Sequence, residues 1–370
     1  MKVALIHDHL AQDGGAEKVL KVFADMFEEA PIYTLLYEKK HVDKYFKNRR
    51  IDTSIIQKLP GGVKHYQWYL PFMPMAVEFY DLSNYNLVIS DTSSFAKGVI
   101  TKPECLHICY CHTPTRYLWS DTHQYINELK YNKWLKKIIG LILNRVRLWD
   151  RLAADRVDLF IANSKTVQER ITKYYRRDSV VIYPPVETHK FTVRDLSGQV
   201  EGDKYFLAGC RLAPYKRIDL VIEAFKILGP DYKLKIFGDG VDLERLKIIA
   251  ASASNIEFLG RVSEEEKVKL FENAQAYLHP QEEDFGIAAV EAMAAGRPVI
   301  AYRKGGATET VIAGETGLFF DEQRATALAA VIRQFKATEF NPEKIKSHAE
   351  QFSVANFTRQ IREFIASHKK

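Results

Sequence analysis

The sequence has little cysteine, no long hydrophobic run and no internal repeat. Its four cysteines, in a chain of 370 residues, are too few and too clustered for a disulfide framework, which is typical of a reducing compartment. No apolar stretch approaches the roughly 18 to 20 residues that span a bilayer, and the N-terminus lacks the basic region and cleavage site of a signal peptide. We therefore expect a cytoplasmic protein that is not secreted.

The cysteine cluster raises the question of a zinc site. Cys105, His107, Cys109 and Cys111 alternate along one apolar run. Alternate residues of a strand point the same way in a row, spaced roughly 6 to 7 Å apart, and a row does not close tetrahedrally around one ion. The pattern favours a buried strand, and we expect no bound metal.

The length and the apolar content predict two domains. A chain of 370 residues with 46% apolar content exceeds what one hydrophobic core usually supports. Short apolar runs alternate with helical patterns, which indicates parallel sheets covered by helices, an α/β architecture formed twice. Pro184 and Pro185, together with the polar stretch 192–204, suggest an N-terminal domain of residues 1–187 and a C-terminal domain of residues 188–351. The expected strands are 3–7, 87–90, 106–110 and 159–163 in the first domain and 205–209, 234–237, 256–259, 276–279 and 298–302 in the second.

The segment 283–298 is the most informative part of the chain. It places Glu283 on a loop after an apolar run and Glu291 about a turn and a half into a helix that begins near Phe285 or Gly286. A helix start offers free N–H groups and positive dipole potential, so the backbone of 284–287 is suited to hold a phosphate or sugar hydroxyls. The alternative is an ordinary amphipathic helix with two solvated acids.

A basic loop follows the apolar run 205–209. Arg211 and Lys216 lie five positions apart at the end of a predicted strand, where open α/β sheets bind their ligands. A guanidinium and an ammonium that converge on one diphosphate offset the charge of a departing nucleoside diphosphate without a metal. Considered alone, such a loop is also compatible with a solvated surface.

Together these segments resemble a known enzyme family. The two acids, the continuation Ala-Met-Ala-Ala-Gly-Arg-Pro-Val-Ile-Ala and the later Gly-Gly-Ala-Thr-Glu are similar to the E-x7-E signature of family 4 glycosyltransferases. That family consists of retaining enzymes of the GT-B fold, in which two Rossmann-like domains face each other across a cleft. The resemblance implies that the last helix, about 352–368, packs back on the N-terminal domain.

The resemblance also assigns roles to residues of the C-terminal domain. Arg211 and Lys216 would stabilise the leaving diphosphate with no cofactor, and Glu291 would accept hydrogen bonds from the ribose. Glu283, with the amides of Asp284, Phe285 and Gly286, would hold the sugar hydroxyls.

Two further segments of the C-terminal domain are expected to contact the donor. Gly238 ends a predicted strand, where its backbone would approach a ligand, although a tight turn explains it equally well. Position 243 is leucine, so the three-glycine dinucleotide fingerprint fails. The run 259–262 resembles the loop on which these transferases rest the nucleotide base, which assigns Arg261 and Val262 there.

The N-terminal domain is expected to carry the acceptor. Gly14 and Gly15 precede a helix expected at 16–27 and resemble the family's glycine-rich first loop, where amides would meet a phosphate. A plain strand-to-helix turn is the alternative. Asp8 and Asp13 fall in the same loop and would cap the helix or touch an acceptor hydroxyl.

A histidine defines a narrower resemblance. His112 lies in the run Cys-His-Thr-Pro-Thr-Arg-Tyr-Leu-Trp, which resembles a mannosyltransferase-like subgroup of family 4. The segments 70–78 and 85–90 carry the same resemblance. In that subgroup the matching histidine faces the donor sugar and stabilises the reacting centre. His9 departs from the family pattern, in which an aromatic residue such as tryptophan is expected at this position. The resemblance therefore does not define the acceptor pocket.

A basic amphipathic segment at 126–151 suggests a membrane surface as a partner. It carries seven Lys or Arg against two acids, interleaved with tryptophan, leucine and isoleucine. A core helix with solvated lysines is the alternative. Family members that use polyprenyl-linked acceptors bind membranes with this face, so we expect peripheral contact with the inner face of the cytoplasmic membrane. No nucleic-acid motif accompanies the charge.

The resulting expectation is a retaining transferase that moves a hexose onto a glycan or lipid-linked oligosaccharide acceptor in polysaccharide biosynthesis. Mannose from GDP-mannose is the expected donor, and a UDP-sugar is the alternative. A GT-B epimerase or phosphorylase and a non-catalytic membrane scaffold are the rivals from other classes.

Overall fold

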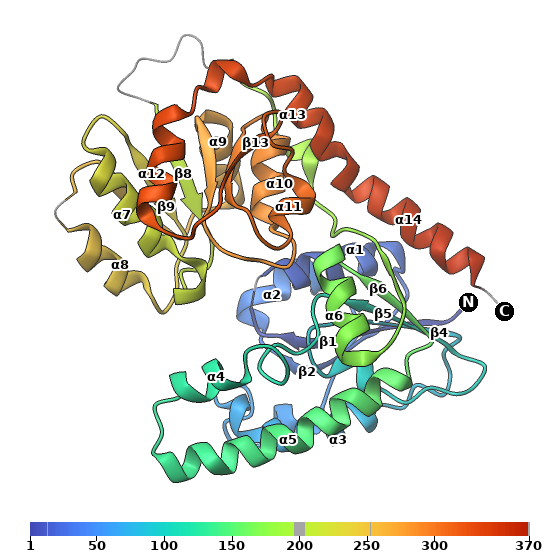
Figure 1. Cartoon of the computed structure of the whole chain (residues 1–370). Coiled ribbons are helices and arrows are strands. Elements are labelled where there is room, and N and C mark those ends of the chain that lie inside the picture. Colours follow the sequence, from blue (N-terminus) through green and yellow to red (C-terminus); the bar gives the residue numbers. More distant parts are fainter. Residues whose placement is uncertain (13, 196–203, 252, 369–370) are drawn as a thin grey trace. The chain divides into compact units, whose positions relative to one another are not determined.

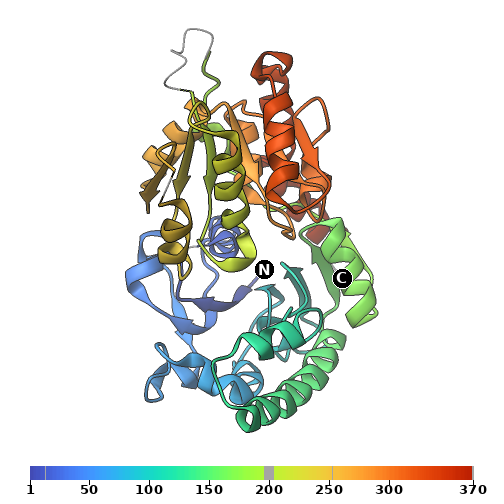
Figure 2. The ribbon, with the colours of Figure 1, turned by 60° about the vertical axis from the view of Figure 1, so that its left-hand side comes forward.

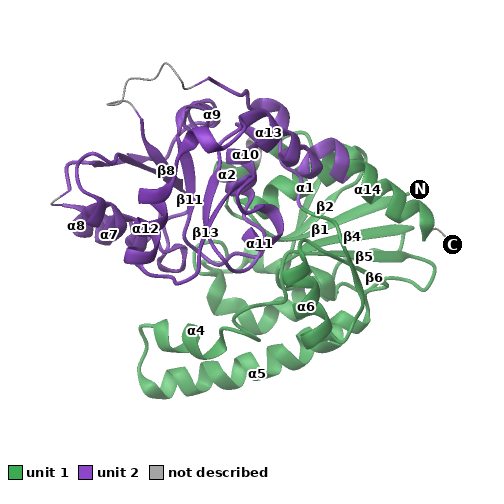
Figure 3. Ribbon diagram, turned by 45° about the horizontal axis from the view of Figure 1, so that its top comes forward, with its two compact units in different colours: residues 1–183, 358–370 green, residues 184–357 purple. Residues whose placement is uncertain are grey.

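The computed structural model describes residues 1–12, 14–195, 204–251 and 253–368. The chain forms two compact units (Figure 3). Unit 1 comprises Met1–Tyr183 and Thr358–Lys370, and unit 2 comprises Pro184–Phe357. The chain therefore passes from unit 1 to unit 2 between Tyr183 and Pro184, slightly before the expected position 187.

Unit 1 is built on a seven-stranded parallel sheet with the strand order β3-β2-β1-β4-β5-β6-β7 (Figures 1 and 2). The strands β4 and β5 are buried along almost their whole length, as expected for central strands covered on both faces. All four expected strands are present, whereas β2, β3 and β7 were not expected. The strands are β1 Val3–Leu10, β2 Ile32–Tyr37, β3 Ile51–Thr53, β4 Leu87–Thr92, β5 Leu106–Cys111, β6 Leu159–Ala162 and β7 Ser179–Val181.

Two helices of unit 1 are preceded by residues that are favoured as N-caps. Asn132 and Ser164 accept backbone N–H groups at the starts of α5 and α6, as N-cap residues do. The helices are α1 Gly15–Met26, α2 Lys39–Phe46, α3 Met73–Glu78, α4 Thr122–Glu128, α5 Lys133–Asp155 and α6 Lys165–Tyr175, with the 3-10 turns η1 Ile55–Lys58, η2 Tyr66–Phe72 and η3 Ala96–Gly98. The last helix, α14 Val354–Ser367, crosses the division between the units.

Unit 2 contains a six-stranded parallel sheet with the order β10-β9-β8-β11-β12-β13. Its strands are β8 Phe206–Gly209, β9 Leu234–Phe237, β10 Ile256–Gly260, β11 Ala276–His279, β12 Val299–Tyr302 and β13 Gly317–Phe320. Its helices are α7 Ile218–Leu228, α8 Leu243–Ala250, α9 Glu264–Asn273, α10 Ile287–Ala294, α11 Ala307–Thr310, α12 Ala325–Gln334 and α13 Pro342–Ala349, with the turns η4 Thr188–Lys190, η6 Pro214–Lys216, η7 Ala337–Glu339 and η8 Glu350–Phe352. The predicted α/β class with parallel sheets is confirmed in both units.

The order of the strands in unit 2 brings separate loops together. Strand β8 pairs with β9 on one side and with β11 on the other. The loops that leave the carboxyl ends of these three strands therefore meet at one edge of the sheet, where α/β folds bind ligands. These loops contain the basic segment, Gly238 and the first acid of the E-x7-E pattern.

The buried strand predicted from the cysteine pattern is present as β5, with Cys109, Cys111 and His107 all buried. The His107 ring lies 2.9 Å from the Ser90 hydroxyl. Within the described residues, none of the helices combines the length and the apolar character needed to cross a bilayer.

Candidate functional site

In unit 2, an ion pair joins the basic loop after β8 to the loop after β11 that carries Glu283. The ammonium of Lys216, at the end of η6, forms an ion pair with the carboxylate of Glu283, after β11. Arg211 donates from Nη2 to the Tyr215 hydroxyl at 2.9 Å, and the Lys216 ammonium lies 5.2 Å from the centre of the Tyr215 ring. Three residues predicted from sequence to handle the donor thus lie on two loops that are tied to each other.

The turn before α10 depends on glycine. Gly286 is the N-cap residue of α10 and has φ of +93°, a left-handed conformation that favours glycine. A Cβ there would lie 3.0 Å from Cε1 of the buried His279. Burial lowers the pKa of His279 to about 3, and the nearby Lys216 charge acts in the same direction, so the ring is neutral. Asp284, Phe285 and Gly286, whose amides were assigned to the sugar hydroxyls, directly precede α10.

Glu291 lies on α10 as predicted, and it is buried, unlike the solvated acid of the alternative interpretation. Its Oε1 accepts a hydrogen bond from the ammonium of Lys267, on α9, at 2.9 Å. The same ammonium lies 2.9 Å from Glu264. Lys267 was not expected at this site, because a lysine in a charged helix carries no local signal of burial.

Gly238 has φ of +119°, and a Cβ at this position would lie only 1.9 Å from the carbonyl oxygen of Cys210. The glycine is therefore required where the loop after β9 packs against the loop after β8. This packing supports the turn interpretation, and a contact between Gly238 and the donor stays a prediction.

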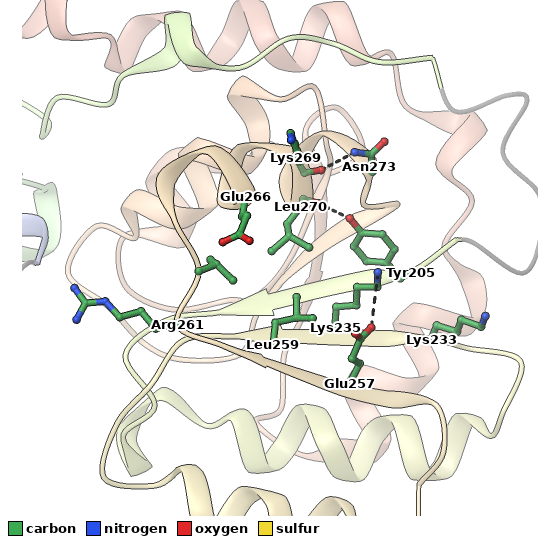
Figure 4. A pocket seen from close by; sticks show the side chains of 11 residues that line it. Tyr205, Lys233, Lys235, Glu257, Leu259, Arg261, Glu266, Lys269, Leu270 and Asn273 are labelled. Atoms are coloured by element: carbon green, nitrogen blue, oxygen red, sulfur yellow. Dashed lines mark hydrogen bonds and ion pairs between the residues drawn. The ribbon is translucent and has the colours of Figure 1, made fainter.

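Arg261 and Val262 line a separate pocket of about 740 Å³ beside β9, β10 and α9 (Figure 4). In the pocket, the Lys235 ammonium lies 4.4 Å from the centre of the Tyr205 ring and 3.7 Å from a Glu257 oxygen. The side chain of Arg261 points away from the other lining side chains. The lining includes none of the residues assigned to the diphosphate, the sugar or the ribose.

In unit 1, the carboxylate of Asp91 lies between two imidazoles. Nε2 of His112 is 2.6 Å from Oδ1 of Asp91, and Nδ1 of His7 is 2.8 Å from Oδ2. Burial by itself lowers the pKa of His7, but the hydrogen bond to Asp91 and the negative charges of Asp91 and Glu17 outweigh it and raise the pKa to about 10. Burial of Asp91 opposes its ionisation, yet the two histidines hold its pKa below the usual value. His7 is therefore a cation and Asp91 an anion at neutral pH.

The glycine-rich first loop connects to this cluster. Gly14 is the N-cap residue of α1, and its N–H donates to Glu17 at 2.9 Å, while Gly15 is the first residue of the helix. The other oxygen of the buried Glu17 lies 3.9 Å from Nε2 of His7. The start of α1 is thus linked through Glu17 and His7 to Asp91.

The expectation that Asp8 caps the first helix is wrong. The Asp8 carboxylate accepts the N–H groups of Ser93, Phe95 and Ala96 and the Thr92 hydroxyl, at 2.7 to 3.0 Å. Burial opposes its ionisation, but the charges of His9 and His7 and these amides lower its pKa. Asp8 therefore holds the loop after β4, because that loop presents several N–H groups to one buried acid. Asp13 lies outside the described residues.

Three members of the unit 1 cluster were not expected from the sequence, namely His7, Asp91 and Glu17. His7 and Asp91 sit near the carboxyl ends of β1 and β4, and these strands are adjacent, with His7 opposite Asp91 in the register. A polar residue at the end of a buried strand is a usable signal. The adjacency of the two strands is not visible in the sequence.

Two family profiles match the chain. Residues 13–190 match the profile described as Glycosyltransferase Family 4, and residues 190–352 match that of Glycosyl transferases group 1. The two matches meet at residue 190, and together they extend over most of the chain.

The chain is also similar to individual known proteins in sequence and in structure. An uncharacterized glycosyltransferase of Methanocaldococcus jannaschii is 29% identical over 56% of this chain and 58% of its own length. The Alpha-1,3/1,6-mannosyltransferase ALG2 of Dictyostelium discoideum is 23% identical over 86% of this chain and 85% of its own length. The crystal structure of HepE from Anabaena, in complex with UDP, matches with a TM-score of 0.72 and 19% identity over 99% of this chain and 100% of HepE.

The fold and these matches define a glycosyltransferase of the GT-B class. The chain belongs to family 4 of the glycosyltransferases, and its sequence is similar to mannosyltransferases of that family.

Proposed function

We propose that the protein transfers mannose from GDP-mannose to a glycan or lipid-linked oligosaccharide, with retention of the anomeric configuration. The observation that carries the proposal is the ion pair between Lys216 and Glu283, formed beside Arg211 and at the start of α10. It joins the two groups that such a reaction needs, cations for a leaving diphosphate and a carboxylate for sugar hydroxyls. The similarity to mannosyltransferases supports the choice of sugar.

In the proposed reaction, negative charge builds on the nucleoside diphosphate as the bond to the sugar breaks. Lys216 and Arg211 bind this charge, so we propose that no metal is required. Glu283 and the amides of Asp284 to Gly286 hold the sugar hydroxyls, and Glu291 accepts from the ribose. The departing phosphate takes the proton of the acceptor hydroxyl, and no protein side chain acts as a dedicated base.

Unit 1 supplies His112 and the acceptor-binding residues in this proposal. The link between Asp91 and His112 supports a defined orientation of the imidazole toward the donor sugar. Gly14 is the N-cap residue of α1 and Gly15 is its first residue, and in this proposal Gly14 contacts the acceptor and Gly15 contacts the donor.

An anionic membrane is the proposed partner of unit 1. Helix α5, which lies beside α4 in Figure 1, buries Leu143 and Val146 on one face. A second apolar stripe on α5 is exposed, including Trp134 at 77% and Leu141 at 71%. A stripe that packing within the unit does not use, accompanied by lysines, is the pattern of a helix that lies in a membrane interface. The stripe consists of Trp134, Ile138, Leu141, Leu148 and Leu152.

A UDP-sugar is the second candidate donor. HepE was crystallised with UDP and with UDP-glucose, and it has the same fold. The base would rest on the loop at Arg261 and Val262, for either nucleotide. A panel of GDP, UDP and ADP in thermal unfolding tests the donor, because a ligand that binds only the native state raises the melting temperature. Stabilisation by UDP alone would remove the GDP-mannose assignment.

Replacement of Lys216 by alanine tests the reaction. Transfer of mannose from GDP-mannose to a polyprenyl-linked acceptor should fall by at least about a hundredfold, as for loss of a group that stabilises transition-state charge. Lys226→Ala is the control, because Lys226 is an exposed lysine of the same unit that pairs with Glu223. Near-normal turnover in Lys216→Ala would refute the assigned role. Release of free sugar or sugar phosphate would instead indicate an epimerase or phosphorylase, and vesicle binding without nucleotide binding would indicate a scaffold.

A further inference from the structure

The ion pair between Lys267 and Glu291 joins two helices of unit 2. Lys267 lies on α9 and Glu291 on α10, and each side chain is only 10% exposed. Nζ of Lys267 donates to Oε1 of Glu291 at 2.9 Å. Lysine and glutamate are almost never buried to this degree unless they are paired, so each depends on the other.

The position of Lys267 in its helix makes the pairing more significant. Helix α9 begins at Glu264 with Ser263 as its N-cap residue, and Lys267 follows within the next turn. The positive end of the helix dipole disfavours a cation there, whereas acids are favoured. The carboxylate of Glu264 lies 2.9 Å from the Lys267 ammonium and offsets part of this unfavourable electrostatic interaction. Helix preference does not explain a buried lysine at this site, but the carboxylate of Glu291 does.

Lys267 also lies close in the chain to the loop assigned to the nucleotide base. Arg261 and Val262 follow β10 directly, Ser263 caps α9, and Lys267 comes one turn later. The ion pair therefore ties the helix that continues from the base loop to the helix that carries the ribose-binding carboxylate. Base and ribose are adjacent parts of one nucleotide.

We infer that Lys267 is a positioning residue that holds the carboxylate of Glu291 for the ribose hydroxyls of the donor. This inference rests on the proposed function, in which Glu291 accepts from the ribose. The ammonium compensates the charge of the buried carboxylate and fixes Oε1, which orients the rest of the group. Without the ammonium, a carboxylate in this environment is desolvated without compensation and its orientation is no longer fixed.

The experiment compares nucleotides that differ only in ribose hydroxyls. Dissociation constants for GDP, UDP and their 2′-deoxy and 3′-deoxy forms are measured by calorimetry. Loss of a hydrogen bond to a charged group is expected to weaken binding of a deoxy form to the wild type by about 10- to 100-fold. In Lys267→Met and in Glu291→Gln this ratio should fall to within about threefold of unity. Lys267→Arg, which keeps the charge, should retain most of the discrimination.

Lys247→Met is the matched control, because Lys247 is an exposed lysine of α8 in the same unit that does not line the pocket of Arg261 and Val262, and its ratio should equal that of the wild type. Should Lys267→Met not fold, Lys267→Gln carries the same expectation, with the ratio reduced by at least about threefold. A purely structural role of Lys267 would lower the melting temperature but leave the ratio unchanged, and that result would overturn the inference. A ratio lost in Glu291→Gln but kept in Lys267→Met would overturn the inference alone. A wild-type ratio near unity would overturn both the inference and the ribose role of Glu291.

Discussion

Nε2 of His112 and Oδ1 of Asp91 lie 2.6 Å apart, on the ends of neighbouring strands of unit 1. Because Asp91 is ionised, Nε2 carries the proton and Nδ1 is the nitrogen of His112 that remains for other contacts. The other oxygen of Asp91 is taken by His7. Asp91 thus determines both the tautomer and the orientation of the histidine assigned to the donor sugar.

Replacement of Asp91 by asparagine should lower kcat for mannose transfer by at least about tenfold, because the amide no longer fixes the proton on His112. The pH dependence of kcat should shift as well, which a purely structural role would not produce. Asp155→Asn, at an exposed acid that pairs with Arg151 on the surface of α5, is the control. An Asp91→Asn enzyme with the wild-type pH profile would contradict this role.

His7 predicts a loss of stability at alkaline pH. Its pKa is about 10 in the folded protein and about 6.5 in an unfolded chain, so folding favours the protonated form. The resulting stability is present in full below about pH 6.5 and is lost as the pH rises from there toward 10. Melting temperatures measured between pH 6 and pH 10 should therefore decline for the wild type. His7→Gln should melt lower at pH 6 and decline less steeply, and parallel curves for the two proteins would contradict the prediction.

Gly286 and Gly314 form a matched pair of glycines with positive φ in unit 2. Alanine at Gly314 meets no atom within 4 Å, so only the backbone conformation costs energy, about 1 kcal/mol. Alanine at Gly286 meets the His279 ring at 3.0 Å as well, and we expect a total loss of about 2 to 4 kcal/mol. Urea unfolding measures both variants. Gly286→Ala should also reduce transfer, because the strain at φ of +93° would shift the backbone that carries the amides proposed to hold the sugar hydroxyls.

The exposed stripe of α5 predicts binding to anionic vesicles. The variant Trp134→Ser with Leu141→Ser should bind vesicles of phosphatidylglycerol and phosphatidylcholine at least about tenfold more weakly than the wild type, because it loses two interfacial apolar side chains. Ile248→Ser is the control, since Ile248 is 76% exposed on α8 of unit 2. Cosedimentation with the vesicles gives the bound fraction. Equal binding of the double variant and the wild type would argue against a membrane role for this stripe.

The positions of many strands along the chain could be predicted from the sequence. The strands at 234–237 and 276–279 are where the apolar runs place them. Short apolar runs report burial on both faces of a sheet, and a glycine or polar residue after them reports the strand's end. The strands missed in unit 1 include β3 and β7, which have three residues each and are not buried, so they carry little hydrophobic signal.

The sequence by itself determined the α/β class, the loops at strand ends and the two acids of the E-x7-E pattern, because these features depend on neighbours along the chain. Only the tertiary structure decided which charges meet. Lys216 pairs with Glu283, Lys267 with Glu291, and His7 shares Asp91 with His112, although each pair is far apart in sequence. It also assigned Asp8 to the amides of the loop after β4. The physical reason is that residues of separate strands and helices become neighbours through the order of strands in the sheet, and local periodicity does not encode that order.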